Sequence, residues 1–268
     1  MLIACPPHSC YSVIEAISNY YRDKIKSFDS QLGYFVEQFV KDKVSAIGVN
    51  IKSGEYVNSD KKSGEIDTAI EFDDLIVLIE TKKKSLTKKS KSGHWLGVIN
   101  DVHKSLLDSQ YQALGHEYSL LKDKEITFKN GEAFQLNDRP IEKISMILFD
   151  YGAIQDRTII RQLLPMYLNC TFSSEDAETY SSLKELYKKC LEYRDLYLKY
   201  ESMFVEKENI PFFGCWFLSV SQLLILLDGV KDFKDFKKAL WQTRHITMKT
   251  FDWYYEYSYV SSLKEVNS

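Results

Sequence analysis

The stretch that most constrains the fold reads Gly64-Glu-Ile-Asp67-Thr-Ala-Ile-Glu-Phe-Asp73-Asp74-Leu-Ile-Val-Leu-Ile-Glu80-Thr-Lys82. Two apolar or alternating runs flank Asp73-Asp74, a polar pair suited to a tight turn. The pattern predicts a β-hairpin with these two residues as its loop. In the register that this loop sets, residue 72 pairs with 75, 70 with 77 and 67 with 80.

This register places Asp67 directly opposite Glu80, and Glu65 opposite Lys82. Opposed side chains have Cβ atoms roughly 5 Å apart, and like charges held that way are destabilising. Glu80 also ends five consecutive apolar residues, 75–79, which is unusual for a merely solvated acid. The two carboxylates therefore require a counter-cation, and a divalent metal is the natural one. Strand alternation puts Lys82 on the same face as Glu80.

The set formed by Asp67 and Glu80-Thr81-Lys82 resembles the PD-(D/E)xK nuclease superfamily, which contains many restriction endonucleases and repair nucleases. Ile66 stands where the motif's name has proline, a position that varies among members. The resemblance covers roughly residues 30–150. It implies that Asp67, Glu80 and the Thr81 backbone carbonyl bind Mg²⁺, for which Mn²⁺ can substitute. It also implies that Lys82 positions or activates the attacking water.

Two further side chains are candidates for this site. Many such nucleases carry an acid on the first core helix, and the resemblance implies that Glu37 assists the metal or its water shell. Glu37 borders the apolar face of a predicted helix over about 31–43; the alternative is an exposed surface glutamate. Some relatives place a glutamine on the helix after the third strand. We expect Gln110 to take this role, because it shares a face with apolar residues, whereas Gln112 falls on a polar face.

A basic segment follows the proposed catalytic strand directly. Such a run is usually a solvated loop, but its position at the mouth of the site favours binding of nucleic-acid phosphates. Contacts of this kind position the backbone without reading sequence. The predicted phosphate-binding residues are Lys83, Lys84, Lys88, Lys89 and Lys91.

The order of elements predicts an α/β fold. This order is the one expected of a restriction-endonuclease-like core, in which helices flank a mixed sheet. It consists of a helix, a strand over 44–51, the two hairpin strands, a long helix over about 100–121 and a strand over 144–149. We assign residues 1–155 to this core. Residues 156–268 read as a mostly helical accessory region, packed on the core or used for dimerisation or partner docking.

Composition narrows the classes further. The 268 residues are 44% hydrophobic and 27% charged, as in ordinary soluble proteins, and the net charge is −3. This charge disfavours a protein that coats nucleic acid through bulk positive charge. Five scattered cysteines fit a reducing cytoplasm, and no apolar stretch predicts a membrane span.

These observations predict a metal-dependent nuclease, with endonuclease action and DNA favoured, acting in restriction or antiviral defence or as the effector of a larger assembly. Cutting both strands would need two sites, which favours a homodimer. The alternative is a non-catalytic nucleic-acid-binding or scaffolding module that retains the fold.

Overall fold

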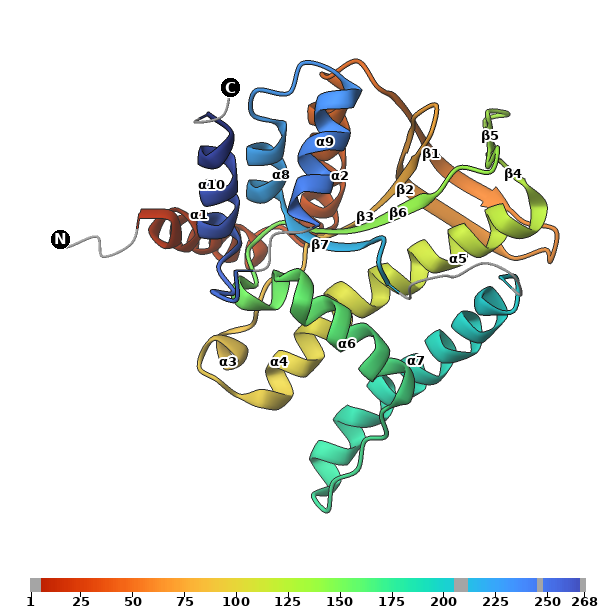
Figure 1. Cartoon of the computed structure of the whole chain (residues 1–268). Helices are drawn as coiled ribbons and strands as arrows, with labels where there is room; N and C mark the ends of the chain where they lie inside the picture. Colours follow the sequence, from red (N-terminus) through yellow and green to blue (C-terminus); the bar gives the residue numbers. More distant parts are fainter. Residues whose placement is uncertain (1–5, 205–211, 245–247, 266–268) are drawn as a thin grey trace.

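A five-stranded mixed sheet runs through the centre of the molecule (Figure 1). The computed structural model describes residues 6–204, 212–244 and 248–265. The strand order is β1-β2-β3-β6-β7; β1, β2 and β3 are antiparallel neighbours, and β6 and β7 continue parallel to β3. The strands are β1 (Asn50–Val57), β2 (Ser63–Glu71), β3 (Ile76–Lys82), β6 (Ile141–Ile147) and β7 (Cys215–Ser219), and a small second sheet pairs β4 (Glu125–Thr127) with β5 (Ala133–Gln135).

Helices cover both faces of the sheet, and Figure 1 shows the two layers. One layer contains α2 (Phe28–Ser45), α8 (Val220–Leu227) and α9 (Phe233–Thr243). The other contains α4 (Trp95–Val102), the π-helix η1 (His103–Leu107), α5 (Asp108–Asp123), α6 (Arg157–Asn169) and α7 (Ala177–Glu201). The remaining helices are α1 (Pro6–Arg22), α3 (Lys88–Lys91), the 3-10 helix η2 (Gly152–Gln155) and α10 (Trp253–Glu265). Each described helix is too short or too polar to span a bilayer.

The predicted hairpin is present as β2 and β3. The Phe72 N–H donates to the Leu75 carbonyl oxygen at 2.9 Å, which closes the turn around the two aspartates. The ladder pairs Ile70 with Val77 and Thr68 with Ile79, so the predicted register is confirmed. Alternate residues of β3 pack in the core cluster that contains α2 and in the cluster that contains Leu120 of α5, so both faces of the strand are buried, which explains its uninterrupted apolar run.

The predicted order of a helix, three strands, a helix and a strand is present as α2, β1, β2, β3, α5 and β6. The predicted first strand over 44–51 is wrong in position. Val36, Val40 and Val44 are spaced by four residues and line one buried face of α2, so the helix continues to Ser45. Strand β1 therefore begins only at Asn50.

The described part of residues 156–268 is mostly helical, as predicted, but it also supplies β7 to the central sheet. Leu223 of α8 and Phe236 of α9 pack in the same apolar cluster as Val40 of α2 and Val77 of β3. Residues on both sides of position 155 thus share one core around the sheet.

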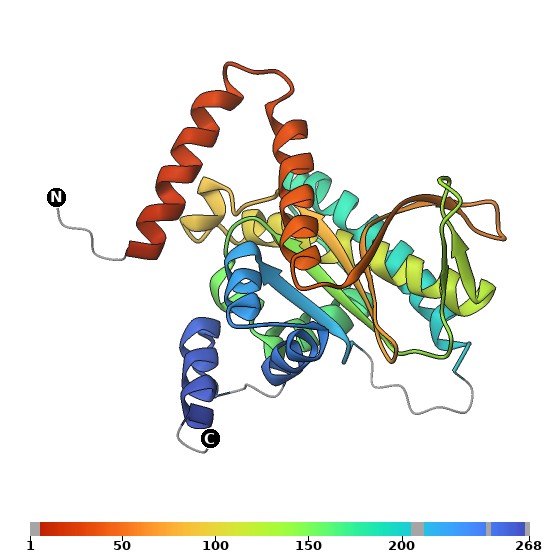
Figure 2. The ribbon, with the colours of Figure 1, turned by 90° about the horizontal axis from the view of Figure 1, so that it is seen from above.

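The first helix lies at the outside of the molecule. Figure 2 shows α1 and α2 as a helical hairpin, in which α2 packs on the sheet. Along α1 the apolar side chains Val13, Ile14 and Ile17 are about half exposed, at 58%, 46% and 53%.

Candidate active site

Asp67 and Glu80 lie just past the last ladder pair of the hairpin, Thr68 and Ile79. Oδ2 of Asp67 accepts a hydrogen bond from the Thr81 backbone N–H at 2.8 Å, so the Asp67 side chain bridges the two strands where their ladder ends. The Glu80 side chain is 1% exposed. Neither of its carboxylate oxygens has a hydrogen-bond partner among the described residues.

The electrostatics of this acid pair are unfavourable. Burial, followed by the charge of Glu80, raises the pKa of Asp67 to about 7, and the Thr81 hydrogen bond offsets only part of this rise. An unpaired buried charge costs several kcal/mol in principle unless a hydrogen bond or counter-ion compensates it. The pair therefore has the charge to hold a cation, and the Glu80 oxygens accept no hydrogen bond from the described residues.

The residues present fit a hard divalent cation. Carboxylate oxygens are the ligands that Mg²⁺ takes from proteins, usually one or two carboxylates with water completing the shell. Within the described ranges, however, no three His, Cys, Asp or Glu side chains gather closely enough to hold a metal ion. The site is thus a pair of acids.

Glu37 lies near this pair without joining it. Its charge contributes to the raised pKa of Asp67, so it is within electrostatic range. Its Oε1, however, is 2.5 Å from Nζ of Lys41, one helical turn along α2. The carboxylate is therefore engaged by a lysine of its own helix.

Lys82 and Gln112 form the polar edge of the site. Nζ of Lys82 donates a hydrogen bond to Oε1 of Gln112. Gln112, and not the favoured Gln110, is the glutamine that contacts Lys82. Gln110 is fully buried between α5 and the sheet, where its Nε2 donates to the Ser145 hydroxyl at 2.8 Å and the Trp216 carbonyl at 3.2 Å.

Two residues that the sequence did not indicate stand behind Glu80. Nε2 of His116 lies 3.2 Å from Oε1 of Glu80, close enough for an ion pair but not aligned as a hydrogen bond. Nδ1 of His116 is hydrogen-bonded to the Tyr56 hydroxyl at 2.7 Å, which fixes the imidazole ring. His116 follows Gln112 by one helical turn, and this spacing was the only signal for it.

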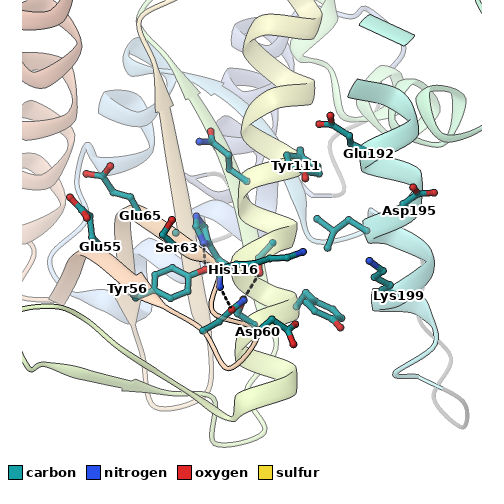
Figure 3. A pocket seen from close by; sticks show the side chains of 18 residues that line it. Glu55, Tyr56, Asp60, Ser63, Glu65, Tyr111, His116, Glu192, Asp195 and Lys199 are labelled. Atoms are coloured by element: carbon teal, nitrogen blue, oxygen red, sulfur yellow. Dashed lines mark hydrogen bonds between the residues drawn. The ribbon is translucent and has the colours of Figure 1, made fainter. Parts of the chain in front are cut away.

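Two hollows flank the site, and both are lined by Tyr111 and Gln112 of α5. The first, of about 640 Å³, lies between the β1–β2 hairpin and α7 (Figure 3). It is lined by five acids and two lysines: Glu55, Asp60, Glu65, Glu192, Asp195, Lys62 and Lys199. The second, of about 590 Å³, is lined by Lys82.

The basic segment after β3 is more structured than a solvated loop. Asp101 is buried and accepts hydrogen bonds from the Thr87 N–H at 2.6 Å and from the Ser90 hydroxyl, and Lys84 pairs with it at 3.1 Å. Lys91 pairs with Glu15.

Three of the five predicted phosphate-binding lysines are therefore held by protein groups, since Lys83 Nζ also donates to the Asp29 carbonyl. Lys88 and Lys89 lie exposed on the short helix α3.

Comparisons with known proteins find no matching family model, no matching curated protein and no matching solved structure.

Proposed function

We propose that this protein is a metal-dependent phosphodiesterase of the PD-(D/E)xK type, a nuclease. The observation that carries the proposal is the acid pair at the end of the hairpin. Asp67 has a pKa raised to about 7 beside Glu80, whose buried oxygens have no hydrogen-bond partner among the described residues. Lys82 lies two residues beyond Glu80 on the same strand. The order α2, β1, β2, β3, α5, β6 is also the one that the restriction-endonuclease-like core implies.

In this proposal Asp67, Glu80 and the Thr81 carbonyl hold Mg²⁺, for which Mn²⁺ can substitute. A bound divalent ion supplies polarisation of a phosphoryl oxygen and a more acidic water. The ammonium of Lys82 orients the attacking water, and its hydrogen bond to Gln112 keeps that ammonium in place. Glu37 acts on the site through its charge rather than as a ligand.

The substrate is proposed to be DNA, cut internally, in restriction or defence, either by a homodimer or within a larger effector assembly. This part of the proposal rests on the habits of the family that the motif resembles.

A non-catalytic nucleic-acid-binding module is the second candidate. The observation that favours it is the absence, within the described ranges, of a third acid or histidine positioned to complete a metal site. Metal binding without cleavage would support this alternative.

The test is cleavage of supercoiled plasmid and linear DNA in Mg²⁺, Mn²⁺ or EDTA. Wild type is compared with Glu80→Gln and Lys82→Gln, and Lys238→Gln, an exposed lysine on α9, serves as the matched control. We expect metal-dependent cutting in wild type and the control, and a loss of at least about 100-fold in both site variants. If wild type leaves DNA intact in every metal buffer, RNA is tested next. Failure of wild type to cut either nucleic acid would contradict the proposal.

A further inference from the structure

The second hollow differs from the first in charge. Its lining combines Lys82, Lys104 and Lys189 with only two acids, Asp108 and Glu185. The first hollow has an excess of acids, so a polyanion is repelled there and attracted to the second. Because Lys82 lines the second hollow, this basic surface is continuous with the proposed catalytic lysine.

A π-helical turn contributes to the wall of the hollow. Residues His103–Leu107 form η1 within the otherwise continuous run of α4 and α5. Single π-helical turns inside α-helices are rare and are frequent at functional sites. The first two residues of this turn, His103 and Lys104, both line the hollow.

His103 is a buried polar side chain without a hydrogen bond at one ring nitrogen. The residue is 3% exposed, and its Nδ1 has no partner among the described residues. A buried imidazole nitrogen without a partner is costly in free energy, and His103 is one of the residues that line the hollow. A phosphate oxygen would accept a hydrogen bond from it.

The three lysines are compensated to different degrees. Lys189 of α7 lies 3.2 Å from Glu192 and 3.9 Å from Asp108, with its Nζ 4.6 Å from the centre of the Tyr111 ring. Lys82 is bonded to a neutral amide, Gln112. Lys104 is exposed on the rim and forms no hydrogen bond or ion pair with a described residue.

We propose that this hollow is a phosphate-binding subsite, in which Lys104, Lys189 and His103 hold a backbone phosphate of the nucleic acid beside Lys82. This inference rests on the proposed nuclease function and deepens it. It also places the substrate backbone along η1 and α7, away from the α3 lysines that the sequence favoured.

The experiment measures binding of a labelled DNA duplex, and of the single strand of the same sequence, by fluorescence anisotropy in EDTA over about 50–200 mM salt. The variants are Lys104→Gln with Lys189→Gln, and His103→Phe; Lys238→Gln on α9 is the matched control. Cleavage of the same duplex in Mg²⁺ and Mn²⁺ is recorded in parallel.

We expect the double lysine variant to lower the slope of log K against log salt by about 2, roughly one for each lost phosphate contact. His103→Phe should weaken binding at every salt concentration without changing the slope, because it removes a hydrogen bond rather than a lysine charge. The control should match wild type in both respects.

The outcomes separate the two proposals. Cleavage by wild type with unchanged binding by the double variant would overturn the subsite and leave the nuclease function intact. Binding that depends on both lysines, without cleavage, would support the subsite and favour the non-catalytic module. Neither binding nor cleavage by wild type would overturn both.

Discussion

Glu80 is a buried carboxylate whose two oxygens have no hydrogen-bond partner among the described residues, opposite a second acid. Such an arrangement is unfavourable for folding, and proteins keep local conflicts of this kind mainly at functional sites. The site is thus defined by two acids that the fold compensates only in part, through the Thr81 N–H beside Asp67 and the His116 imidazole beside Glu80.

Asp67→Asn should raise the free energy of unfolding of the metal-free protein above pH 7. Asp67 has a folded pKa of about 7, above the unfolded value of about 3.9, so the folded state binds the extra proton between these values. Stability therefore decreases as pH rises through this window, and an uncharged Asn escapes the loss. Urea unfolding across this range, in EDTA, checks the prediction. A difference between variant and wild type that does not change with pH would contradict it.

His116→Phe should weaken Mn²⁺ binding by about tenfold, because residues that orient a ligating carboxylate typically contribute 10–100-fold to metal affinity. Tyr56→Phe, which removes the hydroxyl bonded to His116 Nδ1, should act in the same direction but less strongly. Tyr118→Phe is the control, because it changes a tyrosine of the same hollow and leaves the bond between Tyr56 and His116 in place. Calorimetric titration measures all three. Wild-type affinity in His116→Phe would show that the imidazole does not support Glu80.

At the element scale, the hairpin could be predicted because its loop and its alternation both act over a few residues. The register from residue 68 to 79 follows directly from them. The choice between Gln110 and Gln112 could not be predicted in this way, because each of these glutamines meets a polar group elsewhere in the fold. Ser145 on β6 and Lys82 on β3 decide which glutamine faces which side, and neither position is readable from the helix alone.

The lysine segment shows the same limit. Its composition is typical of a solvated loop, yet Asp101, some ten residues further along the chain, gathers Thr87, Ser90 and Lys84 around one buried carboxylate. The short helix α3 thus depends on a residue outside the basic run.

Asp101→Ala should lower the free energy of unfolding by about 2–4 kcal/mol, since it removes the acceptor of the part-buried Thr87 N–H, one partner of the buried Ser90 hydroxyl and the counter-charge of Lys84. Urea unfolding measures this loss, and limited proteolysis should cut near α3 first. Asp108→Ala, a partly exposed acid on α5, is the comparison and should change stability much less. Equal effects of the two substitutions would contradict the role of Asp101.

At the scale of the whole molecule, β7 joins the two halves of the chain. It was not predicted because four apolar residues, Cys215–Leu218, are separated from the apolar helix α8 only by Ser219, with no turn signal between them. Pairing of β7 with β6, and burial of Trp216 against the α2 side of the sheet, are long-range contacts that a local pattern does not contain.

A fragment of residues 1–155 should therefore fail to fold cooperatively. It would expose the β6 edge and lose Trp216, Leu223 and Phe236 from the shared core. Circular dichroism during urea titration checks this, with the full chain as control. A sharp transition in the fragment would show that the core before residue 155 is independent.

We propose that Asp67 and Glu80 form a metal site, and Mn²⁺ titration by isothermal calorimetry above pH 7 measures this binding without a substrate. We predict binding by wild type and Lys82→Gln, and affinity at least about tenfold lower in Asp67→Asn and Glu80→Gln. Absence of binding to wild type, or equal binding to both carboxamide variants, would show that these two acids do not hold a metal ion.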